Sequence, residues 1–185
     1  HNKLMPGSCL LCGNDSNARL LCPACVADLP ALPQHLCPQC NEQTTHGERC
    51  GACLKEPPAF TKTSAIFRYE FPVDRIIHAL KYGHQLAIAQ WLGETLAGHP
   101  GIAGHDCIMA MPLHPQRLCE RGFNQSARLA GRIARRTGSK NLSGILSRNP
   151  SASTQSRLSR ENRKENVKNC FKARAAEALS GKNIL

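Results

Sequence analysis

Two stretches of the sequence, CLLCGNDSNARLLCPAC at Cys9–Cys25 and CPQCNEQTTHGERCGAC at Cys37–Cys53, decide the N-terminal fold. Each contains two Cys-x-x-Cys pairs, and nine residues separate the pairs in both stretches. A thiolate pair of this spacing can place both sulfurs on one metal from a tight turn, and two such turns complete a tetrahedral zinc site. The sequence therefore predicts a module with two structural zinc ions, whose ligands are Cys9, Cys12, Cys22, Cys25, Cys37, Cys40, Cys50 and Cys53.

Cysteine-rich sequences also occur as disulfide scaffolds or as redox motifs. A disulfide scaffold is typical of secreted chains, whereas this N-terminus lacks the apolar core of a signal peptide. A lone Cys-x-x-Cys pair is compatible with a redox motif, but four pairs in succession favour metal. The equal nine-residue gaps favour sequential pairing of the knuckles over an interleaved arrangement that would use the same ligands. No run of about eighteen apolar residues occurs, so we expect a cytoplasmic protein without a membrane span.

Length and charge distinguish the rest of the chain from the cysteine-rich part. A chain of 185 residues suits one ordinary domain plus a small appendage, and Pro57 and Pro58 end the appendage. We therefore expect a double zinc ribbon over residues 5–58 and a second domain over residues 59–185. The net charge of +11 is concentrated in residues 116–182, which carry sixteen basic and four acidic side chains. Such a region favours a polyanion as its partner.

Hydrophobic patterning predicts an α/β domain after Pro58. The apolar run at 106–112 is typical of a strand that is buried on both faces of a parallel sheet. Apolar residues at helical spacing predict helices, and alternating residues predict further strands. The expected helices cover 72–82, 85–97 and 125–137, and the other expected strands lie at 64–69, at 141–147 and from Ser180 onward.

The segment between the strand at 106–112 and the helix at 125–137 is basic. Its sequence, LHPQRLCERGFNQ at Leu113–Gln125, predicts a glycine-containing loop that leads into the N-terminus of a helix. Free backbone N–H groups and the helix dipole attract anions there, and Arg117 and Arg121 add formal charge. The alternative is a solvated basic turn without a ligand.

The expected helix at 125–137 combines an apolar face with a basic one. Leu129 and Ile133 lie on the apolar face, and no acidic residue occurs between Arg121 and Arg160. The basic face is either a solvated surface or a contact for nucleic acid, and we expect contact with single-stranded DNA. The expected DNA-binding residues are Arg128, Arg132, Arg135, Arg136, Arg157, Arg160, Arg163 and Lys164.

Aromatic residues are scarce in the C-terminal region, where only Phe123 and Phe171 occur. Proteins that bind single strands usually stack bases on aromatic rings. We therefore expect the strand to be held by its phosphates more than by its bases.

Several short motifs occur together with the cysteine pairs. They are LKY at Leu80–Tyr82, PLHP at Pro112–Pro115, RGFNQ at Arg121–Gln125 and TQSRLSR at Thr154–Arg160. This combination resembles the ComF family of competence proteins and its relative GntX, over nearly the whole chain from Cys9 to Leu185. The resemblance implies a bacterial protein in which a double zinc ribbon precedes a type I phosphoribosyltransferase-like, Rossmann-like domain. It also implies a role in handling incoming single-stranded DNA during natural transformation, with other DNA-uptake proteins as partners.

The same resemblance implies a substrate site. In type I phosphoribosyltransferases the loop after the first core strand binds pyrophosphate, which corresponds here to a pyrophosphate or anion site at Arg117, Arg121, Gly122, Asn124 and Gln125. Residues 148–169 would be a flexible hood over the substrate, and PRPP and Mg²⁺ would be further cofactors. The adjacent acidic pair of the PRPP loop does not occur in this sequence, so we expect the chain to end before that motif.

Three functions therefore compete at the level of sequence. The leading hypothesis is a competence protein that handles single-stranded DNA. The alternative is a phosphoribosyltransferase that uses PRPP and an unidentified acceptor, with no catalytic residue assigned. A zinc adaptor that only recruits other proteins would fit the cysteine pairs but would leave the basic charge unexplained.

Overall fold

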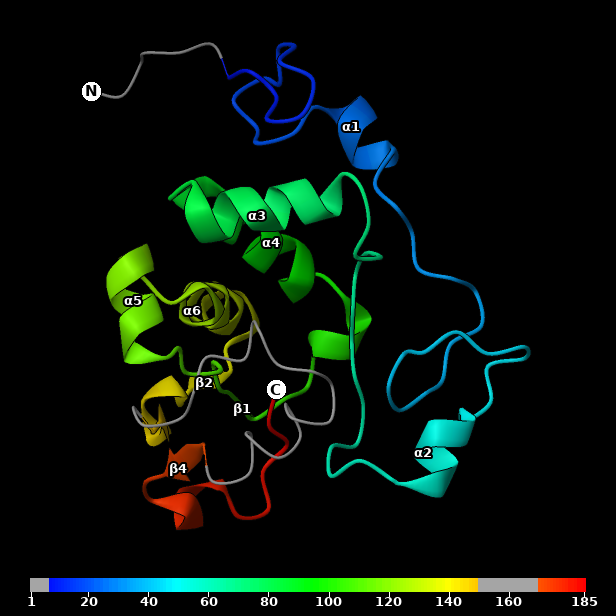
Figure 1. The fold of residues 1–185 in the computed structure, drawn as a ribbon, viewed down its shortest axis with the longest axis vertical. Coiled ribbons are helices and arrows are strands. Elements are labelled where there is room, and N and C mark those ends of the chain that lie inside the picture. The colour runs from blue at the N-terminus through cyan, green and yellow to red at the C-terminus, as the bar shows by residue number, and fades with distance from the viewer. Residues whose placement is uncertain (1–6, 150–169) are drawn as a thin grey trace. The chain divides into compact units, whose positions relative to one another are not determined.

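The computed structural model describes residues 7–149 and 170–185 (Figure 1). The chain divides into two compact units, His1–Ile77 and His78–Leu185. The division falls inside helix α3 (Val73–Tyr82), beyond the prolines at which the sequence suggested a boundary. Cysteine motifs of the zinc-ribbon type lie in the first unit, and helices with a small parallel sheet make up the second.

The first unit is a tandem repeat whose halves are offset by 28 residues, as Cys9 is from Cys37. The short helices α1 (Pro23–Ala27) and α2 (Gly51–Lys55) occupy equivalent positions in the two halves. The isolated bridges also repeat at this offset, because Ser8 pairs with Asp15 and Leu36 pairs with Gln43. The two ribbons therefore share one backbone design.

The first turn of each half needs a left-handed residue. The N–H of Gly13 donates to the carbonyl of Cys9 at 2.9 Å, and the N–H of Asn41 donates to the carbonyl of Cys37 at 3.0 Å. Gly13 has a φ of +75° and Asn41 has a φ of +60°. Glycine adopts this region without a steric penalty, and asparagine tolerates it better than most other residues. The sequence thus uses two different residues for the same turn.

The prediction of a strand at 64–69 is wrong. The backbone there consists of bends and irregular structure. Its Arg68 N–H donates to the carbonyl of Pro30 at 3.0 Å instead of to a neighbouring strand, and the N–H of Thr63, just before the segment, donates to the carbonyl of Gln39 at 2.7 Å. Alternation alone does not make a strand when no partner strand is available for a ladder.

The second unit contains the helices that the sequence predicted. They begin and end within one residue of the expected bounds, because apolar residues at helical spacing mark each of them. A further helix, α5, lies where a loop was expected. Besides α3, the helices are α4 (Leu86–Ala97), α5 (Pro115–Arg121) and α6 (Gln125–Thr137), with 3₁₀ turns at Pro100–Ile102, Ser143–Ile145 and Ala176–Leu179.

A small parallel sheet has β1 (Cys107–Ile108) at its centre. Strand β2 (Lys140–Asn141) pairs with β1 on one edge. On the other edge Cys107 forms a parallel bridge with Ile184, and the N–H of Leu185 donates to the carbonyl of Cys107 at 3.0 Å. The strand expected from Ser180 onward is therefore present as a single bridge. The ladder of β1 is shorter than the expected run at 106–112.

The prediction of one continuous strand at 141–147 is wrong, because the backbone there is interrupted. A 3₁₀ turn at Ser143–Ile145 separates β2 from β3 (Leu146–Arg148), which pairs antiparallel with β4 (Phe171–Ala173) in a second sheet. The hydroxyl of Ser143 donates to Oδ1 of Asn141 at 2.6 Å. Such local side-chain bonds compete with a continuous ladder.

The core of the second unit lies between β1 and α6, with α4 beside α6 (Figure 1). Ile102, Ile108 and Ile133 are buried there with three alanines. Helix α4 approaches α6 closely at Gly93, where a Cβ atom would lie 2.8 Å from the Cβ of Arg132. This close approach places the basic residues of α6 along the α4 surface.

Candidate metal centres and basic surface

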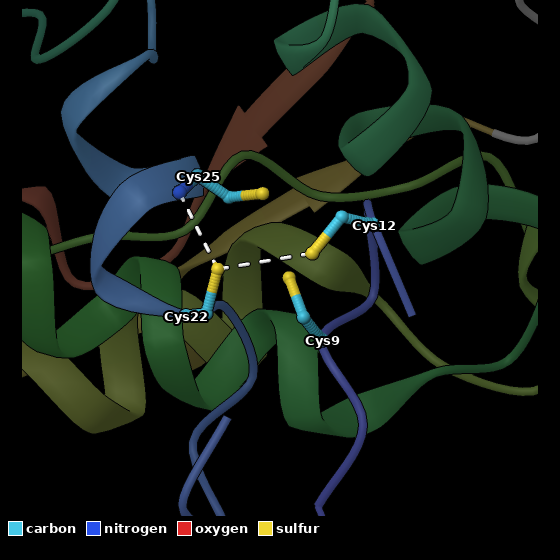
Figure 2. Close-up of side chains that lie close together, drawn as sticks. All are labelled: Cys9, Cys12, Cys22 and Cys25. Atoms are coloured by element: carbon cyan, nitrogen blue, oxygen red, sulfur yellow. Dashed lines mark hydrogen bonds between the residues drawn. The ribbon is translucent and has the colours of Figure 1, made fainter. Parts of the chain in front are cut away.

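Four cysteine sulfurs of the first ribbon converge on one point (Figure 2). The Sγ atoms of Cys9, Cys12, Cys22 and Cys25 all lie within 4.8 Å of one another. Cys22 is the N-cap of α1, and its Sγ accepts a hydrogen bond from the N–H of Cys25 at 3.5 Å. Burial raises the pKa of the Cys9 thiol, but backbone N–H groups, led by that of Cys12, outweigh it and lower the pKa to about 6. The backbone of the knuckle therefore favours a thiolate.

The second ribbon forms the same cluster from Cys37, Cys40, Cys50 and Cys53, again within 4.8 Å. The sulfurs of Cys40 and Cys50 are 3.5 Å apart. Hydrogen bonds from the backbone, that of Cys40 foremost, lower the pKa of Cys37 to about 6. Burial and the neighbouring thiols raise the pKa of Cys53 to about 12.

These clusters fit divalent zinc. Four thiolates at such separations repel one another, so without a cation some of them must keep their protons, as the raised pKa of Cys53 shows. Four sulfur ligands without an open position are the donor set of a structural zinc site. Each cluster takes its ligands from consecutive knuckles, which confirms the sequential pairing. The two centres thus hold two structural zinc ions.

The segment expected to be an anion-binding loop contains helix α5. The side chain of His114 caps its N-terminus by accepting from the N–H of Gln116 at 3.2 Å, and Gly122, with a φ of +70°, ends it. Proline at the first helical position and glycine after the last are the usual helix signals, and both are present in the sequence. Arg117 lies on α5 and forms an ion pair with Glu120 at 2.7 Å.

Arg121 packs on an aromatic ring. Its guanidinium carbon lies 5.0 Å from the ring centroid of Tyr82, and its Nη2 donates to the Tyr82 hydroxyl at 3.3 Å. Its Nη1 donates to Oε1 of Gln125 at 3.3 Å. Phe123 is buried and faces the ring of His84 at 6.4 Å. The Arg-Gly-Phe sequence therefore contacts the residues that join α3 to α4.

Asn124 and Gln125 begin helix α6. The Asn124 side chain accepts from the N–H of Ala127 at 3.3 Å and donates to the carbonyl of Met111 at 3.0 Å. Gln125 is buried, with 8% of its surface exposed. Both residues hold the start of α6 in place. Their binding of pyrophosphate or another anion stays a prediction.

Three of the four arginines of α6 line one groove. The groove has a volume of about 190 Å³ and lies between α4 and α6, where Leu86, Ala89 and Gln90 face Arg128, Arg132 and Arg135. Arg128, Arg135 and Arg136 are exposed. Among the described residues, no carboxylate lines the groove. The positive charge at this surface is therefore open to a ligand.

The expectation that Arg132 faces outward with the others is wrong. Its side chain is only 29% exposed and forms an ion pair with Glu94 of α4. Helix periodicity places Arg132 on the polar face, but the close approach at Gly93 brings α4 over that face. Sequence reasoning missed this pair because nothing in the sequence indicates which helix packs on which. Arg157, Arg160, Arg163 and Lys164 lie outside the described residues.

Comparison with known protein families finds a match over the residues that form the two clusters. The double zinc ribbon domain family matches residues 1–54, which contain all eight ligands. The match and the two four-sulfur clusters together show that the N-terminal part of the chain is a double zinc ribbon domain.

Similarity to curated proteins extends over most of the chain. The DNA utilization protein YhgH of Escherichia coli K12 is 32% identical over 178 residues, which cover 91% of this chain and 78% of that protein. Competence protein F of Haemophilus influenzae is 30% identical over 163 residues, which cover 82% of this chain and 69% of that protein. The chain therefore belongs to the ComF family. No solved structure matches significantly.

Among the helices of residues 7–149 and 170–185, none is both long and apolar enough to span a bilayer.

Proposed function

We propose that this protein binds single-stranded DNA during DNA uptake in natural transformation. Its relatives are named for competence and for DNA utilization, which supports a role in DNA uptake or use. In this proposal the protein acts in the cytoplasm, together with other DNA-uptake proteins. The zinc ribbons have a structural role, and the second unit contacts the DNA.

The observation that carries the proposal is the arginine-lined groove between α4 and α6. Arg128 and Arg135 are seven residues apart on one helix, which separates them by about 10 Å along the helix axis. Their charges face the groove and have no carboxylate beside them among its lining residues. A phosphate backbone laid along α6 would neutralise these charges and release its condensed counterions. Residues of the expected basic segment, Arg157, Arg160, Arg163 and Lys164, are proposed to extend this contact.

Fluorescence anisotropy with a labelled, unstructured oligonucleotide tests the proposal. The triple variant R128Q/R135Q/R136Q removes the exposed arginines of α6 and leaves the Arg132–Glu94 pair intact. We expect it to weaken binding at least about tenfold at low salt, because fewer phosphates are neutralised. The matched control K172Q/R174Q/K182Q removes the same formal charge from exposed residues elsewhere in the second unit.

The control should lose much less affinity than the α6 variant. Equal losses in both variants would mean that only net charge matters and would remove the groove from the mechanism. Wild-type protein that fails to bind the oligonucleotide at low salt would refute the proposed function itself.

The sheet supports a second proposal, that residues 59–185 form a phosphoribosyltransferase-like domain after a ribbon module at 5–58. The chain passes from β1 to β2 on one edge and reaches Ile184 on the other. Open α/β sheets bind ligands at such a switch point, beyond the carboxyl end of the central strand. The expected anion site lies on α5 and around the start of α6, the helices that follow β1 in the sequence. Its residues are Arg117, Arg121, Gly122, Asn124 and Gln125.

Titration calorimetry with PRPP and Mg²⁺ tests this second proposal. Binding that is weakened in R121Q would support it, because Arg121 is the last arginine before the start of α6. Absence of binding heat at millimolar PRPP would contradict it.

A further inference from the structure

We propose that Tyr82, held by Arg121, is a platform on which one unpaired base of the bound strand stacks. This inference rests on the proposed function and specifies its substrate, because it makes the site selective for unpaired bases. It differs from the expectation that aromatic stacking contributes little. That expectation counted only the aromatic residues after position 115, whereas the fold brings Tyr82 to the Arg121 side chain.

The ring of Tyr82 is exposed and fixed in position. Tyr82 is the last residue of α3, and 53% of its surface is exposed. Arg121 lies over the ring and donates to its hydroxyl, while the ring of His78 lies 4.7 Å away at an angle of 42°. Gln125 accepts from the same guanidinium. A ring held in this way loses little conformational freedom when a base stacks on it.

Two side chains of the Arg121–Gln125 contact have unused hydrogen-bonding capacity. The Nε of Arg121 and the Nε2 of Gln125 are buried and have no hydrogen-bond partner among the described residues. Both atoms are enclosed by protein, so pairing with a base edge or a phosphate oxygen would require these two side chains to move. The guanidinium also adds a cation to the stacked arrangement.

An exposed aromatic ring recognises bases only when they are unpaired. In a duplex both faces of each base are covered by its neighbours, whereas a single strand can turn a base outward onto a ring. The platform also lies close to the arginine-lined groove. Tyr82 precedes Leu86, which lines the groove, by four residues, so their Cα atoms are at most about 14 Å apart.

A purely structural role is the competing explanation. Arg121 on Tyr82 and Phe123 against His84 would then only hold the α3–α4 connection to the start of α6. The two explanations differ in what a base contributes to binding. Stacking makes the base matter, whereas a structural contact affects binding of the backbone and of the bases alike.

The experiment compares two labelled probes of equal length and charge, oligothymidine and an abasic deoxyribose-phosphate chain. Wild-type protein is expected to bind oligothymidine about fivefold or more tightly than the abasic chain at low salt. Tyr82→Leu should abolish this preference, and Tyr82→Phe should retain it because the ring remains. Tyr69→Leu is the matched control, since Tyr69 is 70% exposed and lies in the first unit. Trp91 fluorescence during thermal unfolding verifies that the second unit of each variant is folded.

The experiment distinguishes a failure of the stacking proposal from a failure of the proposed DNA binding. If wild-type protein binds both probes equally, or if Tyr82→Phe loses the preference as fully as Tyr82→Leu, stacking on this ring is refuted while DNA binding stands. If Tyr82→Leu weakens both probes by the same factor, the contact is structural. If wild-type protein binds neither probe, the proposed function fails as well.

Discussion

Each cysteine of the ribbons has a specific partner set, so single residues decide which metal site is lost. Cys12 and Cys22 belong to one cluster although they come from different knuckles, and their sulfurs are 3.8 Å apart. In an interleaved arrangement these two knuckles would serve different sites. A double substitution therefore distinguishes the two pairings by metal content alone.

We predict that C12S/C22S retains one zinc ion per chain while the wild type holds two. Serine is a poor zinc ligand, and both changes remove thiolates from the same site. Metal analysis of freshly reduced protein measures the stoichiometry. Cys119→Ser is the control, because Cys119 is exposed and lies outside both clusters, so it should keep two ions. Loss of both ions in the double variant would contradict the sequential pairing.

For single residues, the sequence predicted all the metal ligands but not the environments of all the surface arginines. Cysteine spacing reports directly on ligand geometry, because a knuckle is a local structure. The environments of Arg132 and Arg121 depend on residues 38 and 39 positions away, namely Glu94 and Tyr82. Periodicity gives a residue its face on a helix but does not identify what packs there.

Among the elements, the packing of α4 against α6 positions the proposed DNA surface. Gly93 allows the close approach, since a Cβ there would meet both Cβ and Cγ of Arg132 at 3.0 Å or less. The collision involves the base of the arginine side chain, which cannot swing away as its far end can. The spacing of the two helices therefore depends on this glycine.

Replacing Gly93 by alanine is predicted to destabilise the second unit by about 1–3 kcal/mol, because it overpacks the interface. Thermal unfolding followed by Trp91 fluorescence measures the change, since Trp91 is the only tryptophan and lies in α4. The control is Gly98→Ala at the end of the same helix, where the nearest atom to a new Cβ is 3.6 Å away and φ is −79°. Equal stability of G93A and wild type would contradict a net cost of overpacking at this position.

Helices were predicted well and strands poorly, for a physical reason. The pattern of α3, α4 and α6 is set by residues within one turn of each other, so a sequence window contains it. A strand exists only if a partner strand pairs with it, and the segment at 64–69 has no such ladder. The helix α5 was missed although Pro115 at its start and Gly122 after its end are standard helix signals, because its basic residues suggested a loop.

For the molecule as a whole, zinc binding and the proposed DNA binding fall in different units. All eight ligands lie between Cys9 and Cys53, whereas the arginine-lined groove and its own apolar core lie after His78. The ribbons have few buried apolar residues, so each metal contributes on the order of 10 kcal/mol to their folding. The second unit draws its stability from the core around Ile108 and Ile133.

We predict that a strong chelator with reductant unfolds the ribbons and leaves the second unit folded. Released zinc is measured with a colorimetric indicator, and Trp91 fluorescence reports on the second unit, in which it lies. The midpoint of thermal unfolding at Trp91 should stay within a few degrees of that of the zinc-loaded protein. A large fall in that midpoint would mean that the second unit depends on the metal centres.

The salt dependence of binding to a single-stranded oligonucleotide tests the central claim most directly. If Arg128, Arg135 and Arg136 neutralise phosphates, the logarithm of the association constant should fall with the logarithm of salt concentration with a slope of about −2 or steeper. The slope should become shallower by about the same amount in R128Q/R135Q/R136Q. Binding that is independent of salt, or a slope that the triple variant leaves unchanged, would contradict a phosphate contact along α6.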